Sequence, residues 1–292
     1  MDTDWAALDA EWIESRRSEP LPRKLYRAPV GFGRAAGPRN HPPDKTAFLN
    51  QDARRYHNVS ALTDREPLVA LLPPGVELRG DPMLLVGMIW FRNCYFLGGR
   101  DYQALTINIP VTSHRSGSPV DGVYCPVEWH SLPDNVVTAR EEIAYPALWA
   151  DVSPPILRGE GNYTIDASWL GFRFFEMEFN GLKEVTVPAG ARPPSVSILY
   201  KYIPTGYSDG ADCSRLIENN MEEYYKGVGA VEGITVSGEA PSTTLAGSGS
   251  FRFIPARWED MPSQYHIVNR LAALPVLEVR SATVAIRDSA PL

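Results

Sequence analysis

Lysine is scarce in this sequence of 292 residues. Only five of its 28 basic residues are lysines, at positions 24, 45, 183, 201 and 226, and the others are arginines. A buried lysine can lose its proton and act as a Schiff-base nucleophile, whereas arginine stays protonated and binds carboxylates. The imbalance therefore limits the covalent chemistry that is available to this protein.

Long apolar runs and clusters of basic residues are missing too. No apolar stretch approaches the roughly 18 residues of a membrane-spanning helix, and residues 1–6 lack the basic and apolar regions of a signal peptide. The net charge is −7, without a run of lysine and arginine, which argues against nucleic acid or an anionic membrane as the main partner. We therefore expect a cytoplasmic protein whose partner is a small molecule.

Motifs for metals and cofactors are also absent. The three cysteines, Cys94, Cys125 and Cys213, have no CxxC spacing, which favours reduced thiols over a disulfide framework or a zinc site. The five histidines are scattered singly, and there is no phosphate loop, no GxGxxG after a strand, no HExxH and no GxSxG. We expect neither a metal nor a cofactor.

Proline and glycine are abundant, with 26 and 23 residues, and they interrupt the sequence at short intervals. This punctuation is typical of many short strands joined by turns. Runs of β-branched and aromatic residues bounded by turn residues predict strands at 56–62, 84–91, 104–111, 123–129, 163–179, 196–203, 231–236, 250–254 and 277–286. The fold class expected is mainly β with a few helices (α+β), built around a barrel-like core.

Helices are expected at three places. An amphipathic pattern predicts one in residues 1–20, and Thr63 with Glu66 has the spacing of a capping box before a helix at 64–72. A third is predicted at 132–142. Residues 21–50, rich in proline and glycine, predict an extended arm, so we divide the chain into residues 1–50, the N-terminal helix and arm, and 51–292, a single β-barrel domain.

Six segments, in order and at similar spacing, resemble the acetoacetate decarboxylase superfamily over about residues 50–290. They are 54–59 (RRYHNV), 71–78 (LLPPGVEL), 102–111 (YQALTINIPV), 139–146 (AREEIAYP), 199–204 (LYKYIP) and 274–282 (LPVLEVRSA). The resemblance implies a cone-shaped β-barrel with a closed, mostly apolar central cavity. It also implies β-keto acid substrates and assembly into a homo-oligomer.

The resemblance fails at the residues that perform the family's chemistry. In the family, two lysines follow a tyrosine–proline pair, and one forms a Schiff base because its neutral amine is favoured by the second lysine and the apolar cavity. Here Tyr145 and Pro146 are followed by Ala147 and Leu148. Both lysines are therefore absent, and decarboxylation of acetoacetate by this route is not expected.

The two cavity glutamates of the family are replaced as well. One corresponds to Ala104, or to Gln103 in the neighbouring register, and the other corresponds to Gly87. The arginine that binds the substrate carboxylate in the family is matched by Arg54, with Arg55 as the alternative register. Of the family's catalytic set, only this arginine is matched.

These replacements predict a larger and more apolar cavity that has lost its internal charge cluster, which suits a bulky substrate. The residues expected to bind this acid are Arg54, Gly87, Gln103, Ala104, Ala147 and Leu148. A strand with period two places Glu128 and His130 on one face, and a desolvated carboxylate there would serve as general acid or base. Tyr145 matches a pocket tyrosine of the family and could donate a hydrogen bond to an enolate oxygen.

Three hypotheses follow. The first is a lysine-independent enzyme of the lyase, hydratase, isomerase or cyclase type, with Arg54 binding a bulky apolar keto or enol acid and Glu128, His130 or Tyr145 moving protons. The second is a Schiff-base decarboxylase or aldolase that uses Lys201, the only lysine inside a predicted core strand. The third is a non-catalytic binding protein for an apolar acid.

Overall fold

The computed structural model describes residues 7–8, 11–12, 15, 53–94, 97–186, 196–207, 209–220 and 242–287. Residues 7–8, 11–12 and 15 are helical, which agrees with the N-terminal helix expected there. The arm expected at 21–50 and the strand expected at 231–236 lie outside the described residues. The described part is mainly β, as the sequence predicts.

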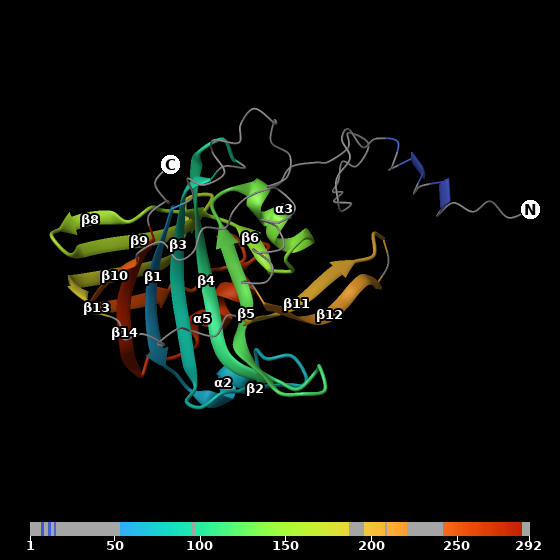
Figure 1. The fold of residues 1–292 in the computed structure, drawn as a ribbon, viewed down its shortest axis with the longest axis horizontal. Coiled ribbons are helices and arrows are strands. Elements are labelled where there is room, and N and C mark those ends of the chain that lie inside the picture. Colours follow the sequence, from blue (N-terminus) through green and yellow to red (C-terminus); the bar gives the residue numbers. More distant parts are fainter. Residues whose placement is uncertain are drawn as a thin grey trace, which may run out of the picture.

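Fourteen strands of the described residues form one sheet, accompanied by the helices α2 (Arg65–Val69), α3 (Pro133–Glu141) and α5 (Tyr265–Ala272) (Figure 1). The strands are β1 (Ala53–Leu62), β2 (Val76–Leu78), β3 (Met83–Cys94), β4 (Arg100–Ser113), β5 (Val120–His130), β6 (Ala147–Trp149), β7 (Asp151–Val152), β8 (Ile156–Gly159), β9 (Asn162–Trp169), β10 (Phe172–Val185), β11 (Val196–Pro204), β12 (Ala211–Asn220), β13 (Ser242–Phe253) and β14 (Glu278–Arg287).

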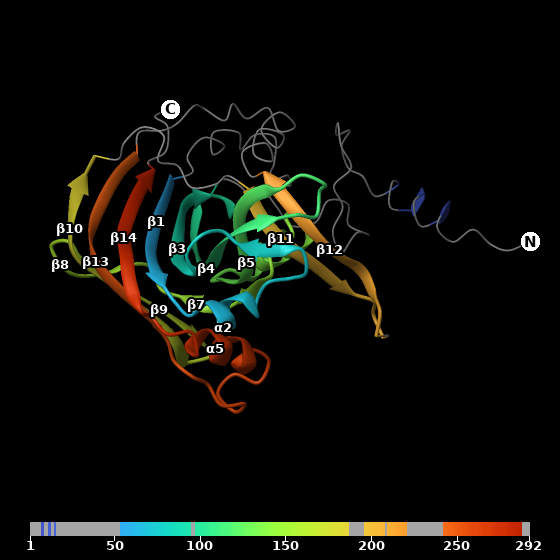
Figure 2. The ribbon, with the colours of Figure 1, turned by 90° about the horizontal axis from the view of Figure 1, so that it is seen from below.

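The sheet is strongly curved, and a short segment links two strands that are far apart in the strand order. The main path is β12-β11-β5-β4-β3-β1-β14-β13-β10-β9-β7. Residues 147–152 contain β6, which pairs with β5, and β7, which pairs with β9, separated by the single residue Ala150. One short segment therefore links β5 to β9 and brings the two halves of the sheet together. Figure 2 shows the resulting arc, with α2 and α5 beneath it.

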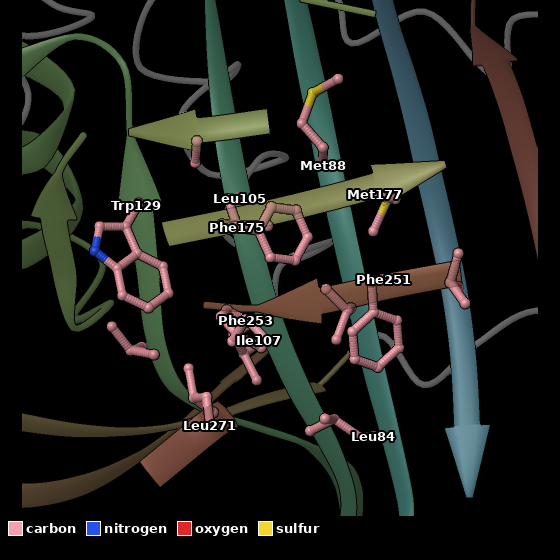
Figure 3. Close-up of a cluster of buried hydrophobic side chains, with 14 of the residues drawn as sticks. Leu84, Met88, Leu105, Ile107, Trp129, Phe175, Met177, Phe251, Phe253 and Leu271 are labelled. Carbon is pink, nitrogen blue, oxygen red and sulfur yellow. The ribbon is translucent and has the colours of Figure 1, made fainter. Parts of the chain in front are cut away.

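The apolar core lies between the two halves of this curved sheet. Alternate residues of β4, including Leu105, Ile107 and Ile109, are fully buried against it, as period two requires of a strand with one core-facing side. Aromatic side chains from the crossing strands β10 and β13, such as Phe175 and Phe251, fill the same space (Figure 3). The core thus fixes which residues of β3, β4 and β5 point to the other face.

Helix α5 closes one end of this core. The indole nitrogen of Trp129 donates a hydrogen bond to Oε1 of Gln264, the residue before α5, at 2.7 Å, and both residues are buried. Val268 and Leu271 of the helix pack into the core. Their spacing of three residues is a helical signal that was not used in the sequence analysis.

Helix α3 lies on the opposite side of the sheet. It connects the parallel strands β5 and β6 as a crossover and packs against both of them. None of its residues belongs to the main core cluster among the described residues, whereas Leu148 of β6 does pack against that cluster. Figure 1 shows α3 in front of the sheet and α5 behind it.

Most predicted strands and the helix at 132–142 are confirmed, but three local expectations are wrong. Residues 163–179 form a hairpin, β9 and β10, because Leu170 and Gly171 turn the chain with φ values of 46° and 95°. Helix α2 is shorter than 64–72 and makes no side-chain cap, and Oγ1 of Thr63 is buried without a hydrogen-bond partner. Strand β12 was not predicted because its sequence is mostly polar, and four of its ten residues are exposed.

His57 is a buried titratable residue on the core face of β1. It is 2% exposed and contacts Phe179 and Tyr163 edge-on, with ring centroids 5.9 and 6.5 Å away. Its Nδ1 atom has no hydrogen-bond partner. Burial disfavours the charged imidazolium and lowers the pKa of His57 from 6.5 to about 4.

This burial predicts a loss of stability in mild acid. Because the folded-state pKa is depressed, the unfolded chain binds the proton first, so the contribution of His57 is present above pH 6.5 and is lost as the pH falls towards 4. Between pH 7 and pH 5 the free energy of unfolding should decrease by about 2 kcal/mol from this residue. Urea denaturation at both pH values should show this decrease, and His57→Leu should remove it.

A substitution that removes no titratable group provides the control. Met88→Leu, at the buried residue paired with His57, should leave the pH dependence of unfolding as it is in the wild type. An equal pH dependence in the wild type and in His57→Leu would show that His57 binds its proton equally well in the folded and the unfolded chain.

Candidate active site

The candidate residues gather on the face of the sheet that points away from the core. Directly paired residues of neighbouring strands share a face, and the pairing register runs Asn58, Gly87, Thr106, Glu128, Ala147 across β1, β3, β4, β5 and β6. A second row, two residues further along each strand, runs Tyr56, Ile89, Ala104, His130, Trp149. We call these two rows the site face.

A buried carboxylate–imidazole pair lies on the site face. Oε1 of Glu128 and Nε2 of His130 are 2.7 Å apart, and the two residues are 4% and 6% exposed. Their spacing of two on β5 puts both on one face, as the sequence predicted. Nδ1 of His130 is buried and has no hydrogen-bond partner among the described residues. The pair therefore holds one imidazole nitrogen and leaves the other available for a ligand.

A stack of planar groups extends from His130 to Arg54 across the sheet. The rings of His130 and Tyr102 are 5.8 Å apart with an interplanar angle of 22°, and Tyr102 stacks on Phe91 at 4.4 Å and 5°. The guanidinium carbon of Arg54 lies 5.3 Å from the Phe91 ring centroid. Stacking of this kind restrains the ring planes and the cation. Arg54 and His130 therefore lie at the two ends of one stack of planar groups, Arg54, Phe91, Tyr102 and His130, which we call the ladder.

Cys125 lies near the same carboxylate. It is 1% exposed, and its Sγ donates to the carbonyl of Val127 at 3.5 Å. Burial, and after it the negative charge of Glu128, raises the pKa of the Cys125 thiol well above its usual value. Cys125 is therefore a protonated thiol near the pair and does not act as a thiolate nucleophile.

Alternation separates the other expected binding residues into two groups. Ala104 is paired with His130, and Ala147 with Glu128, so both belong to the site face. Leu148 packs against the core instead. Gln103 lies on the same side of β4 as the core residue Leu105, and its Oε1 accepts a hydrogen bond from Ser131 at 3.0 Å.

Gly87 does not open a vacant space. A Cβ atom built on it would lie 2.4 Å from Oδ1 of Asn58 and 3.2 Å from Oγ1 of Thr106. Thr106 also donates a hydrogen bond to the Gly87 carbonyl at 3.3 Å. The polar ends of two neighbouring side chains therefore occupy the position that a larger residue at 87 would need.

Tyr145 and Lys201 lie beside the site face, towards β11. The hydroxyl of Tyr145 is 2.8 Å from the hydroxyl of Ser197, and its ring packs with Cys125 and Leu199. Lys201 donates from Nζ to the carbonyl of Glu141, the last residue of α3, at 2.7 Å. A lysine at a helix C-terminus is a stabilising surface interaction, and this contact gives Lys201 a structural role.

Several residues on the site face, or in the row next to it, were not found from the sequence. Phe91 and Tyr102 are aromatic residues of predicted strands, which an apolar core would equally explain, and their ladder is visible only once β3 and β4 are paired. Asn58 and Thr106 give no motif at all. Their pairing opposite Gly87 is a property of the register.

Two broader features concern the whole described part of the chain. None of its helices has the length and apolar character that a transmembrane segment requires. No group of three or more histidine, cysteine and acidic side chains gathers in a metal-binding arrangement within these residues.

Residues 36–289 match the family model described as acetoacetate decarboxylase (ADC). This match covers most of the chain, and the protein belongs to the acetoacetate decarboxylase family. The fold expected from the resemblance is thereby confirmed. No curated protein matches the sequence.

Solved structures share the fold at low identity. An acetoacetate decarboxylase superposes with a TM-score of 0.60 at 15% identity over 82% of this chain and 86% of its own. The enzyme from Legionella pneumophila gives 0.55 at 15% identity over 95% and 93%. The enduracididine biosynthesis enzyme MppR, complexed with pyruvate, gives 0.56 at 17% identity over 81% and 85%. These likenesses support the fold and leave the chemistry to this chain's own residues.

The crowding at Gly87 predicts a specific coupling between β1 and β3. Gly87→Ala should lower the free energy of unfolding by about 1 kcal/mol, the lower end of the overpacking range, because the new methyl group displaces the exposed side chain of Asn58. Asn58→Ala in the same chain should recover most of this loss, which urea denaturation of the two single variants and the double variant would measure.

Gly206 serves as the control, since a Cβ there would meet nothing within 4 Å. Gly206→Ala should therefore be close to neutral. Additive effects of Gly87→Ala and Asn58→Ala would contradict the close approach of these two residues.

Proposed function

We propose that this protein is a lysine-independent enzyme that enolises a bulky oxo acid, using His130 and Glu128 for proton transfer and Arg54 for the substrate carboxylate. The observation that carries the proposal is the buried Glu128–His130 pair, which lies beside Ala147, the position of a missing family lysine. Family membership supports an acid substrate with a carbonyl group. The reaction types that remain open are those that begin with loss of a proton next to that carbonyl.

The proton-transfer step follows from the hydrogen bonding of His130. If Nε2 carries the hydrogen that Glu128 accepts, Nδ1 is the basic nitrogen. Nδ1 takes a proton from the carbon next to the substrate carbonyl, the C–H bond breaks, and its electron pair moves to the carbonyl oxygen. The carboxylate of Glu128 stabilises the imidazolium that forms, and returning the proton regenerates the oxo acid or its isomer.

The length of the ladder supports a bulky substrate. Arg54 is on β1 and His130 on β5, three strand spacings apart, or roughly 14 Å between backbones. Phe91 and Tyr102 line this distance with apolar rings. An acid whose carboxylate is bound by Arg54 and whose reacting carbon lies at His130 needs an apolar body between the two groups.

The ligands of one structural relative suggest which compounds to test on this protein. The structures of MppR include complexes with pyruvate and with the condensation product of pyruvate and imidazole 4-carboxaldehyde. These ligands belong to that protein. They make oxo acids with an attached ring or chain a reasonable first panel for this one.

Hydrogen–deuterium exchange tests the proposal without knowledge of the final product. With 9-oxodecanoate, whose carbonyl group is separated from the carboxylate by an apolar chain, the wild-type protein in D₂O should accelerate exchange of the protons next to the carbonyl, measured by proton NMR. His130→Asn and Glu128→Gln should each reduce the rate by about 100-fold, a usual effect of removing a general base or its partner. His114→Asn, at an exposed site, should leave it unchanged.

Two results would count against this chemistry. Binding of the panel without exchange would indicate a non-catalytic binding protein. Reduction with borohydride that leaves an adduct on Lys201, found by mass spectrometry, would indicate Schiff-base chemistry instead.

Arg54 and Arg55 provide a matched pair for the carboxylate site. Both lie over aromatic rings, Arg54 over Phe91 and Arg55 over Trp90, but on opposite faces of β1. Arg54→Gln should weaken binding of 9-oxodecanoate tenfold or more, because a charge-assisted bond to the carboxylate is lost. Arg55→Gln should leave the affinity, measured by calorimetry, within twofold. Equal effects would exclude the assignment to Arg54.

A further inference from the structure

Helix α3 carries a buried carboxamide that no group of the described residues satisfies. Asn135 is 3% exposed, and neither its Nδ2 nor its Oδ1 has a hydrogen-bond partner among the described residues. An amide buried without partners costs free energy that an apolar residue of similar size would not. Such a residue is explained most directly by a ligand that supplies the missing hydrogen bonds.

The position of α3 directs this carboxamide to the site face. Asn135 and Ala139, one turn apart, are the two buried residues of the helix, and α3 packs on β5 and β6. Because α3 contributes nothing to the main core cluster, the face it covers is the one that carries Glu128, His130 and Ala147.

Two hydrogen bonds set the direction of the helix over that face. Ala139 accepts from the backbone nitrogen of Tyr145 at 2.9 Å, and Nη1 of Arg140 donates to the carbonyl of Ala147 at 3.4 Å. The C-terminal half of α3 therefore lies by the start of β6. Its first turn, with Asn135, lies towards the end of β5, where His130 precedes it by five residues.

We infer that Asn135 is a substrate-binding residue that donates a hydrogen bond from Nδ2 to the carbonyl oxygen of the oxo acid and to the enolate oxygen formed from it. This inference rests on the proposed function. Both unsatisfied groups, Nδ1 of His130 and the Asn135 carboxamide, then belong to one ligand: the imidazole takes the proton from carbon, and the amide stabilises the charge that develops on oxygen.

Two substitutions of Asn135 test the hydrogen bond that its amide donates. Asn135→Leu removes both the donor and the acceptor, and it should not lower the melting temperature, because an unsatisfied buried amide is lost. Asn135→Asp keeps the size and the acceptor but places a carboxylate where the enolate oxygen would bind. Asp134→Leu removes an exposed polar group from the same helical turn and serves as the matched control.

Two measurements on the full-length chain test the inference. The first is the exchange rate of 9-oxodecanoate in D₂O. The second is the affinity, measured by calorimetry, for nonanedioate, whose second carboxylate places a negatively charged oxygen at the position of the enolate oxygen. Asn135→Leu should reduce kcat for exchange by at least tenfold with a smaller change in KM, and should weaken nonanedioate binding tenfold. Asn135→Asp should weaken nonanedioate binding further, and Asp134→Leu should change neither value.

The outcomes separate this inference from the proposed function. If exchange depends on His130 but Asn135→Leu and Asn135→Asp retain wild-type kcat and nonanedioate affinity, the assignment of Asn135 is overturned and the proposed function stands. If the wild type catalyses no exchange, yet nonanedioate binding depends on Asn135, the site is a binding site and the catalytic proposal falls. If nonanedioate does not bind and no exchange occurs, both are overturned.

Discussion

Pairing register in β3, β4 and β5 governs both the core and the candidate site, because a shift of one residue would exchange the two faces of the sheet. In the observed register Leu105 and Trp129 face the core, while Thr106, Glu128 and His130 face away from it. The buried aromatic residues of β10 and β13 pack against the first group and make any other register costly. Hydrophobic packing therefore fixes the position of polar residues that take no part in it.

The candidate ionisable pair lies next to positions where the resemblance places the family's lysines and glutamates. By that resemblance, those positions correspond to Ala147, Ala104 and Gly87, which suggested a face without charge. Glu128 and His130 on β5 are paired directly with Ala147 and Ala104. An ionisable pair therefore lies one strand away from these two alanines, and the proposed proton transfer uses this pair in place of a lysine.

The sequence predicts regular features of this fold well and its exceptional residues poorly. Alternation in β4 and β5 located the strands and placed Glu128 and His130 together, because period two needs no tertiary information. The same alternation would have separated Ala147 from Leu148, and Ala104 from Gln103, had the core-facing side been known. Asn135 gave no signal, since an asparagine in the first turn of a predicted helix is ordinary and only burial makes it unusual. The hairpin at Leu170 was missed because a leucine with positive φ contradicts its usual preference.

Buried polar atoms without partners have different meanings on the two faces. His57 lies on the core face between Phe179 and Tyr163, and its lowered pKa keeps it neutral, so its unsatisfied nitrogen is a modest cost within packed aromatic rings. His130 and Asn135 lie on the site face, where a strand and its crossover helix meet. In the proposed reaction these two groups act as a base and a hydrogen-bond donor, which is the combination that enolisation of an oxo acid requires. A buried polar atom without a partner is therefore a cost of packing on the core face and a candidate ligand contact on the site face.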